Sequence, residues 1–140
     1  MSFREKTAWI TLAALLFVIA LYLFHVPSLY EAHPHGWTLI SLAICAGVFV
    51  LIEIVAHIVL AIRNPRDAKT PRDELDKLIE LKSLRVAAYI YFAGSFVAIF
   101  ITIHLMRSSP GLVAMGVVAA FVVAEVANCV ARIVYYRRSA

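Results

Sequence analysis

Hydrophobic residues fall into four long runs that are separated by short polar segments. The runs cover about residues 9–30, 38–62, 86–106 and 112–136. Each is long enough to cross roughly 30 Å of hydrocarbon as an α-helix, at about 1.5 Å per residue. Lipid offers backbone N–H and C=O groups no hydrogen-bond partner, so each run is expected to form a helix, which pairs them internally. The pattern predicts an all-α, polytopic membrane protein with four transmembrane helices in a single domain.

The composition agrees with lipid as the solvent for most of the chain. Of 140 residues, 63% are hydrophobic and 16% are charged, and the mean hydropathy is +0.87. Soluble domains average roughly 45–50% apolar and roughly 25% charged residues. The first run follows two basic residues, as in a signal peptide, but it is longer than such a segment and ends without a small-residue cleavage site. We therefore expect it to be retained.

Lys and Arg residues fall almost entirely on one side of the predicted topology. The N-terminal segment has two, the loop over residues 63–85 has seven and the C-terminal end has three, whereas the opposite side has Arg107 alone. Because cytoplasmic segments are enriched in Lys and Arg, we expect both termini and the 63–85 loop to be cytoplasmic. These cations are expected to attract anionic lipid headgroups. The net charge of +4 then reflects topology rather than nucleic-acid binding.

The 63–85 loop divides the chain into two predicted helical hairpins with related sequences. Residues 47–57 (GVFVLIEIVAH) align without gaps on residues 119–129 (AAFVVAEVANC), with Phe and Glu at matching positions. Such a duplication would be a parallel repeat, with a pseudo-two-fold axis along the membrane normal. Chance similarity between apolar helices is the alternative.

The third helix is predicted to begin well before the membrane. Thr70 is a suitable N-cap, Pro71 suits the first helical position and Asp73 places a carboxylate at the third. We expect one continuous helix from there through residue 106, with Asp73 paired to Lys77. A kink near Ser83 is the alternative.

A short motif covers the start of this helix. Residues 73–89 read DELDKLIELKSLRVAAY. This run resembles the D-E-x-D-x-x-I-E-x-x-S-x-R-x-A-x-Y pattern of small bacterial four-helix inner-membrane proteins of unknown function. The resemblance is centred on Asp73 to Tyr89, and the four-span layout extends it loosely to the whole chain. It implies a location in the bacterial inner (cytoplasmic) membrane and suggests no reaction.

Ionisable side chains lie at the predicted middle of the membrane. Glu53 and Glu125 are each ten residues from the cytoplasmic end of their spans, roughly 15 Å deep. A charged carboxylate there costs about 2.5–3.5 kcal/mol on insertion scales, so it should hold a proton or find a partner. His57 and Cys129 follow these carboxyls at i+4, and Asn128 follows Glu125 at i+3, which places them on the same helix faces. We expect the five residues to converge on one buried polar cluster.

Three interpretations of this cluster compete. Its members can form interhelical hydrogen bonds that specify packing, or Glu and His can exchange protons along a proton or ion pathway. The third interpretation is a metal site, for which two Glu, one His and one Cys are suitable ligands. Arg132 lies two turns beyond Glu125 on the same face and is expected to anchor its helix at the cytoplasmic interface.

A second set of candidate residues lies near the opposite membrane face. It comprises His25, Glu31, His33, His35 and His104. These side chains have the chemistry to bind zinc or copper or to sense pH, and simple solvation is the alternative. A haem held by His25 and His104 is a further possibility. We expect no cofactor.

Small residues mark faces for close helix contact. Ala43-x-x-x-Gly47 in the second run and Gly116-x-x-x-Ala120 in the fourth are both small-xxx-small patterns. They are expected to serve within the bundle or between subunits.

The sequence contains no glycine-rich phosphate loop, G-x-S-x-G, H-E-x-x-H or Cys-x-x-Cys motif, so we do not expect an enzyme. We expect an accessory or scaffolding membrane protein that contacts a membrane-protein partner or a second copy of itself. A small proton-coupled or metal-ion transporter or channel that uses the buried cluster is the alternative. The expected cytoplasmic docking residues are Asp73, Glu74, Asp76, Glu80 and Arg85.

Overall fold

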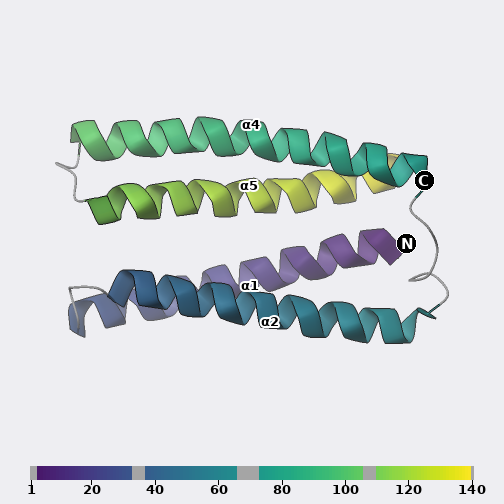
Figure 1. Cartoon of the computed structure of the whole chain (residues 1–140), viewed down its shortest axis with the longest axis horizontal. Helices are drawn as coiled ribbons and strands as arrows, with labels where there is room; N and C mark the ends of the chain where they lie inside the picture. Colours follow the sequence, from purple (N-terminus) through teal and green to yellow (C-terminus); the bar gives the residue numbers. More distant parts are fainter. Residues whose placement is uncertain (1–2, 33–36, 66–72, 106–109, 140) are drawn as a thin grey trace. The chain divides into compact units, whose positions relative to one another are not determined.

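Four long α-helices make up the protein in a computed structural model, which describes residues 3–32, 37–65, 73–105 and 110–139 (Figure 1). The helices are α1 (Phe3–Ala32), α2 (Trp37–Arg63), α4 (Glu74–Leu105) and α5 (Pro110–Ser139). Side chains are described over residues 3–24, 40–65, 73–104 and 113–138. The shortest helix, α2, has 27 residues and is therefore about 40 Å long.

Each helix is long and apolar enough to cross a membrane. The candidate spans are Phe3–Phe24, Ile40–Arg63, Glu74–His104 and Val113–Arg138, and an 18-residue window within each has a mean hydropathy between 2.1 and 2.6. The prediction of an all-helical chain with four membrane-length helices is confirmed.

The chain forms two compact units, Met1–Thr70 and Pro71–Ala140. In the first unit α1 packs along α2, and in the second unit α4 packs along α5 (Figure 1). Buried side chains of α1 recur at helical spacing, as Ala8, Leu12 and Leu15 show. In α2, by contrast, Ser41 alone is buried among residues 40–63.

Small side chains line the contact between α4 and α5. A Cβ atom added at Gly94 would lie 3.1 Å from Ala120 Cβ, and one added at Gly116 would lie 3.0 Å from Ala98 Cβ. Glycine at these two positions therefore lets the backbones approach closely. The Gly116-x-x-x-Ala120 pattern is used inside the second unit.

The start of α4 differs from the predicted one. The helix begins at Glu74, and Asp73 is its N-cap, because the Lys77 N–H donates to the Asp73 carbonyl oxygen at 3.2 Å. Asp76 Oδ2 also accepts the Asp73 N–H at 3.2 Å, which is one of the two hydrogen bonds of a capping box. The predicted start at Pro71 is wrong, since a carboxylate pair later in the sequence caps the helix. Thr70 and Pro71 themselves lie outside the described residues.

Two further predictions for α4 have opposite outcomes. The helix runs without interruption through Ser83 to Leu105, as predicted. The predicted pairing of Lys77 with Asp73 is also wrong. The Asp73 carboxylate accepts the Glu74 N–H at 2.7 Å instead, and Lys77 Nζ lies 3.7 Å from Glu74 Oε1.

Candidate functional site

A hydroxyl, a carboxylate and an imidazole meet between α1 and α2. Thr11 Oγ1 donates a hydrogen bond to Glu53 Oε2 at 3.1 Å, and His57 Nδ1 lies 3.2 Å from the same oxygen. His57 Nδ1 also lies 2.8 Å from the backbone carbonyl oxygen of Glu53. Two oxygen acceptors therefore lie within reach of Nδ1, which assigns a proton to this nitrogen; in a neutral ring Nε2 is then an acceptor.

The environment of these side chains is mostly apolar but not closed. The Glu53 side chain is 18% exposed and the His57 side chain is 42% exposed. Glu53 Oε1 is buried and accepts no hydrogen bond from any residue that the structure describes. A half-paired carboxylate is costly in an apolar environment, so Oε1 is a position where a proton or a further donor would be stabilised.

The corresponding side chains of the second unit interact more weakly. Asn128 Nδ2 donates to Glu125 Oε2 over a long 3.4 Å, and Asn128 Oδ1 is buried without a hydrogen-bond partner among the described residues. Cys129 is buried beside them and, like Cys45, is not in a disulfide. Glu53 and His57 belong to the first unit and the other three to the second, so the convergence of all five on one cluster stays a prediction.

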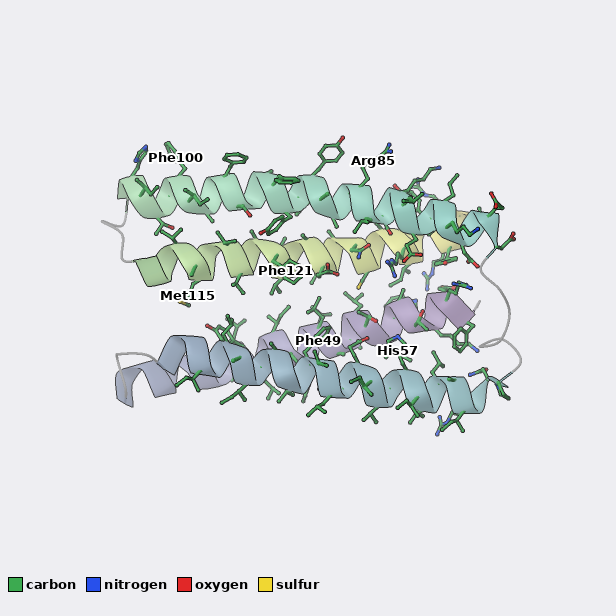
Figure 2. The ribbon with its side chains drawn as sticks, in the orientation of Figure 1. Phe49, His57, Arg85, Phe100, Met115 and Phe121 are labelled. Atoms are coloured by element: carbon green, nitrogen blue, oxygen red, sulfur yellow. The ribbon has the colours of Figure 1, made fainter. Side chains whose placement is uncertain are left out.

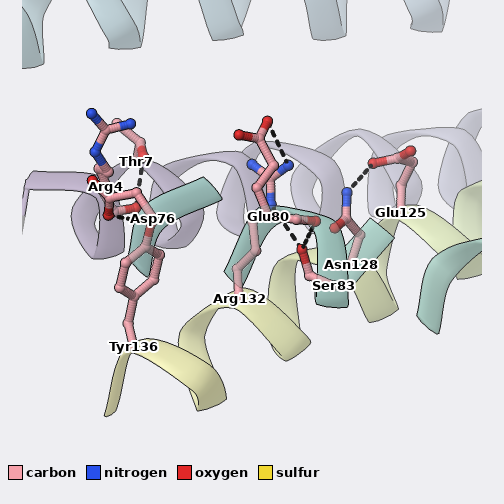
Figure 3. A network of polar contacts seen from close by, with 9 residues as sticks. All are labelled: Arg4, Thr7, Asp76, Glu80, Ser83, Glu125, Asn128, Arg132 and Tyr136. Atoms are coloured by element: carbon pink, nitrogen blue, oxygen red, sulfur yellow. Dashed lines mark hydrogen bonds and ion pairs between the residues drawn. The ribbon is translucent and has the colours of Figure 1, made fainter. Parts of the chain in front are cut away.

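A ladder of polar contacts joins the first turns of α4 to the last turns of α5 (Figure 3). Tyr136 donates to Asp76 Oδ1 at 3.0 Å. One turn further, Arg132 Nε donates to Ser83 Oγ at 3.4 Å, and Arg132 Nη2 lies 3.6 Å from Glu80 Oε1. Ser83 is fully buried, and its hydroxyl donates to the Glu80 carbonyl oxygen at 2.9 Å. Arg132, expected to act as an interfacial anchor, thus contributes directly to helix packing.

The predicted docking residues divide between two faces of α4. Asp76 and Glu80 contact α5 through the ladder, whereas Asp73, Glu74 and Arg85 are exposed. Figure 2 shows Arg85 on the side of α4 that points away from α5. Only the exposed members are therefore turned toward the surroundings of the second unit.

The predicted outer site is described in part. The His104 side chain is exposed, and its ring packs edge-on against Phe100 with centroids 4.5 Å apart. His25 and Glu31 lie within α1, and His33 and His35 lie outside the described residues, so this site stays a prediction. In the described ranges, no three His, Cys, Asp or Glu side chains are placed to hold a metal ion together.

Three contributors were missed from the sequence, namely Thr11, Ser83 and Tyr136. Thr11 lies within an apolar run, where a hydroxyl needs a partner and is a usable signal. Ser83 follows Glu80 at i+3, which places both on one face of α4. Tyr136 has the position of an interfacial aromatic anchor, and nothing in the sequence indicates that it bonds to Asp76.

No known protein family matches the chain, and neither a curated protein nor a solved structure is similar enough to be a relative. The four helices, each long and apolar enough to cross a membrane, are compatible with the broad class of helical membrane proteins.

Proposed function

We propose that the chain is a small accessory or scaffolding protein of the bacterial inner membrane, which acts through contacts between its helices and those of a partner. It crosses the membrane as two helical hairpins, with both termini and the 63–85 loop in the cytoplasm. The charge distribution supports this orientation, because Arg107 alone of 13 Lys and Arg residues falls on the opposite side.

The observation that carries the proposal is an open small-residue face on α2, formed by Ala43, Ala46 and Gly47. All three residues are exposed, and a Cβ atom added at Gly47 would meet no atom within 4 Å. In the α4–α5 contact, glycines in the same kind of pattern touch the neighbouring helix. The α2 face thus has the shape for a close helix contact, and α1 does not cover it.

The presence of glycine at this position supports the same conclusion. A glycine inside a helix costs roughly 1 kcal/mol of helix stability relative to alanine. At Gly94 and Gly116 the close contact between α4 and α5 offsets that cost. A side chain at Gly94 would crowd α5, and one at Gly116 would crowd α4. Gly47 makes no such contact within its unit, so nothing there offsets the loss of helix stability. A close contact with a partner helix on this face would offset it.

His57 adds a polar contact beside this face. Its ring is half exposed, and it lies ten residues after Gly47, on the flank of the same side of α2. Because Nδ1 is held by Glu53, Nε2 is available to a donor on the partner. A hydrogen bond between helices in a membrane is worth on the order of 1 kcal/mol, which favours a specific partner over lipid.

The proposal is tested by comparing Gly47→Leu with Val55→Leu, a control at another exposed position of α2. Tagged chains are crosslinked in native membranes and recovered, and association between copies is followed by energy transfer. Wild type and the control should yield the same specific partner or self-oligomer, and Gly47→Leu should lose it while remaining helical. The proposal fails if wild type yields neither complex or if Gly47→Leu retains it.

A second candidate is proton-coupled or metal-ion transport through Glu53 and Glu125. The contact of Thr11 and His57 with Glu53, together with its unpaired Oε1, favours it. Replacing both glutamates by Gln keeps their shape and removes the titratable charge. Flux into proteoliposomes should then collapse while the helices stay folded. Flux that matches wild type in the double variant, or absent flux in wild type, ends this candidate.

A further inference from the structure

The first three turns of α4 turn several polar side chains toward α5 and leave leucines exposed among charged residues on the other side. Asp76, Glu80 and Ser83 point toward α5, where they contact Tyr136 and Arg132. The contact with α5 is therefore partly polar, while the leucines on the other side, the outer face of α4, stay uncovered. Exposed leucines beside exposed charged side chains suit the boundary between hydrocarbon and polar headgroups.

Leucines make up much of that outer face. Leu75 is 48% exposed, Leu78 48%, Leu81 65% and Leu84 52%. The strip of exposed apolar side chains, interrupted by Lys82 and Arg85, extends to Tyr89, Phe92, Phe96 and Phe100 further along the helix. Isolated exposed leucines are common on protein surfaces, but a long strip of exposed apolar side chains marks contact with a membrane or another protein.

Two cations lie on the same outer face. Lys82 and Arg85 are exposed, at i+4 and i+7 from Leu78, and Arg85 points away from α5 (Figure 2). Neither forms an ion pair with any residue in the described part of the chain, whereas Lys77 lies 3.7 Å from Glu74. Long basic side chains can lie along an apolar surface while their charged ends reach a polar boundary.

We infer that the Glu74–Arg85 segment of α4 lies in the headgroup region of the cytoplasmic leaflet, where Lys82 and Arg85 bind the phosphate of an anionic phospholipid. The acyl chains of that lipid lie against Leu78 and Leu81. An arginine guanidinium suits this role because its N–H groups pair with two phosphate oxygens at once. The inference rests on the membrane topology proposed above.

The length of α4 fits this placement. Its 32 residues span about 48 Å, against about 30 Å of hydrocarbon and about 40–45 Å once the headgroup regions are included. A moderate tilt keeps the whole helix within the bilayer and its interfaces. Lipid is favoured over a protein partner because the apolar strip extends into the part of α4 that faces hydrocarbon.

Lipid binding is tested with the full chain in nanodiscs that contain phosphatidylglycerol and phosphatidylcholine. Native mass spectrometry after release measures which lipids stay bound. Wild type should retain phosphatidylglycerol several-fold over its share in the disc, and the Lys82→Gln, Arg85→Gln double variant should lose this enrichment. Lys77→Gln is the matched control, because it removes a cation that is already paired, and it should behave as wild type. Equal enrichment in the double variant would overturn the inference.

Depth is tested with spin labels at Leu78→Cys and Leu81→Cys, in a chain with Cys45 and Cys129 replaced by Ala. Both labels should be more accessible to oxygen than to a water-soluble nickel chelate. Greater accessibility to nickel would place the leucines in water, and protection from both reagents would indicate a protein partner; either result overturns the inference. Association through Gly47 is read out separately, so its failure is distinguishable from failure here.

Discussion

Arg132 shows at the level of single residues how the second unit places charge inside a helix contact. Its side chain is 35% exposed and that of Glu80 is 41% exposed, so water screens part of their attraction. The additional hydrogen bond to buried Ser83 fixes the guanidinium in one position. We expect the pair to add a modest but measurable amount to the stability of the α4–α5 contact.

A double-mutant cycle with Arg132→Met and Glu80→Met tests this expectation. The coupling energy should be about 0.5–1 kcal/mol, measured as the free energy of unfolding by SDS titration in mixed micelles. The same cycle on Lys77 and Glu74, whose side chains are 59% and 96% exposed, should give no measurable coupling. Strict additivity at Arg132 and Glu80 would contradict the role assigned to the pair.

One contact within a helix could be predicted from the sequence, although the expected Asp73–Lys77 pair does not form, and the contacts between helices could not be predicted. The approach of His57 to Glu53 follows from i,i+4 spacing, which the helix geometry fixes. The bonds of Thr11 to Glu53 and of Arg132 to Ser83 depend on how far one helix slides along its neighbour. Side-chain packing over the whole contact sets that register, and no local pattern reports it.

Helices were identified reliably because hydrophobic length decides which segments enter lipid, but their ends follow different rules. α1 begins at Phe3 and α5 at Pro110, both before the apolar runs, and proline at the first helical position suits a helix start. At α4 the sequence pattern predicted a cap at Thr70. In the structure Asp73 is the N-cap, and its amide donates to the Asp76 carboxylate.

Glycine positions allow a prediction about the packing of whole helices. Gly116→Leu should destabilise the second unit by about 1–3 kcal/mol, because its Cβ alone would lie 3.0 Å from Ala98 Cβ. Gly47→Leu should leave the free energy of unfolding unchanged or raise it by up to about 1 kcal/mol through helix propensity. Both are measured by the same SDS titration. Equal destabilisation at the two positions would refute the conclusion that Gly116 is packed against a neighbouring helix and Gly47 is not.

For the molecule as a whole, the two units differ in what they bury and what they leave open. The first unit holds the Thr11–Glu53–His57 contact and leaves one face of α2 uncovered. The second unit closes its small-residue contact and ties α4 to α5 by the polar ladder. In the proposals made above, the first unit contacts a partner and the second unit contacts lipid. The internal repeat and the convergence of the two glutamates stay predictions.

Every functional proposal depends on four membrane crossings with both termini in the cytoplasm, and reporter fusions test this most directly. Alkaline phosphatase, which is active only when exported, and green fluorescent protein, which fluoresces in the cytoplasm, are fused after Ala140, Ala68 or Ser109. Fusions after Ala140 and Ala68 should fluoresce and lack phosphatase activity, and the fusion after Ser109 should do the reverse. Phosphatase activity after Ala140 would contradict the topology and the proposals built on it.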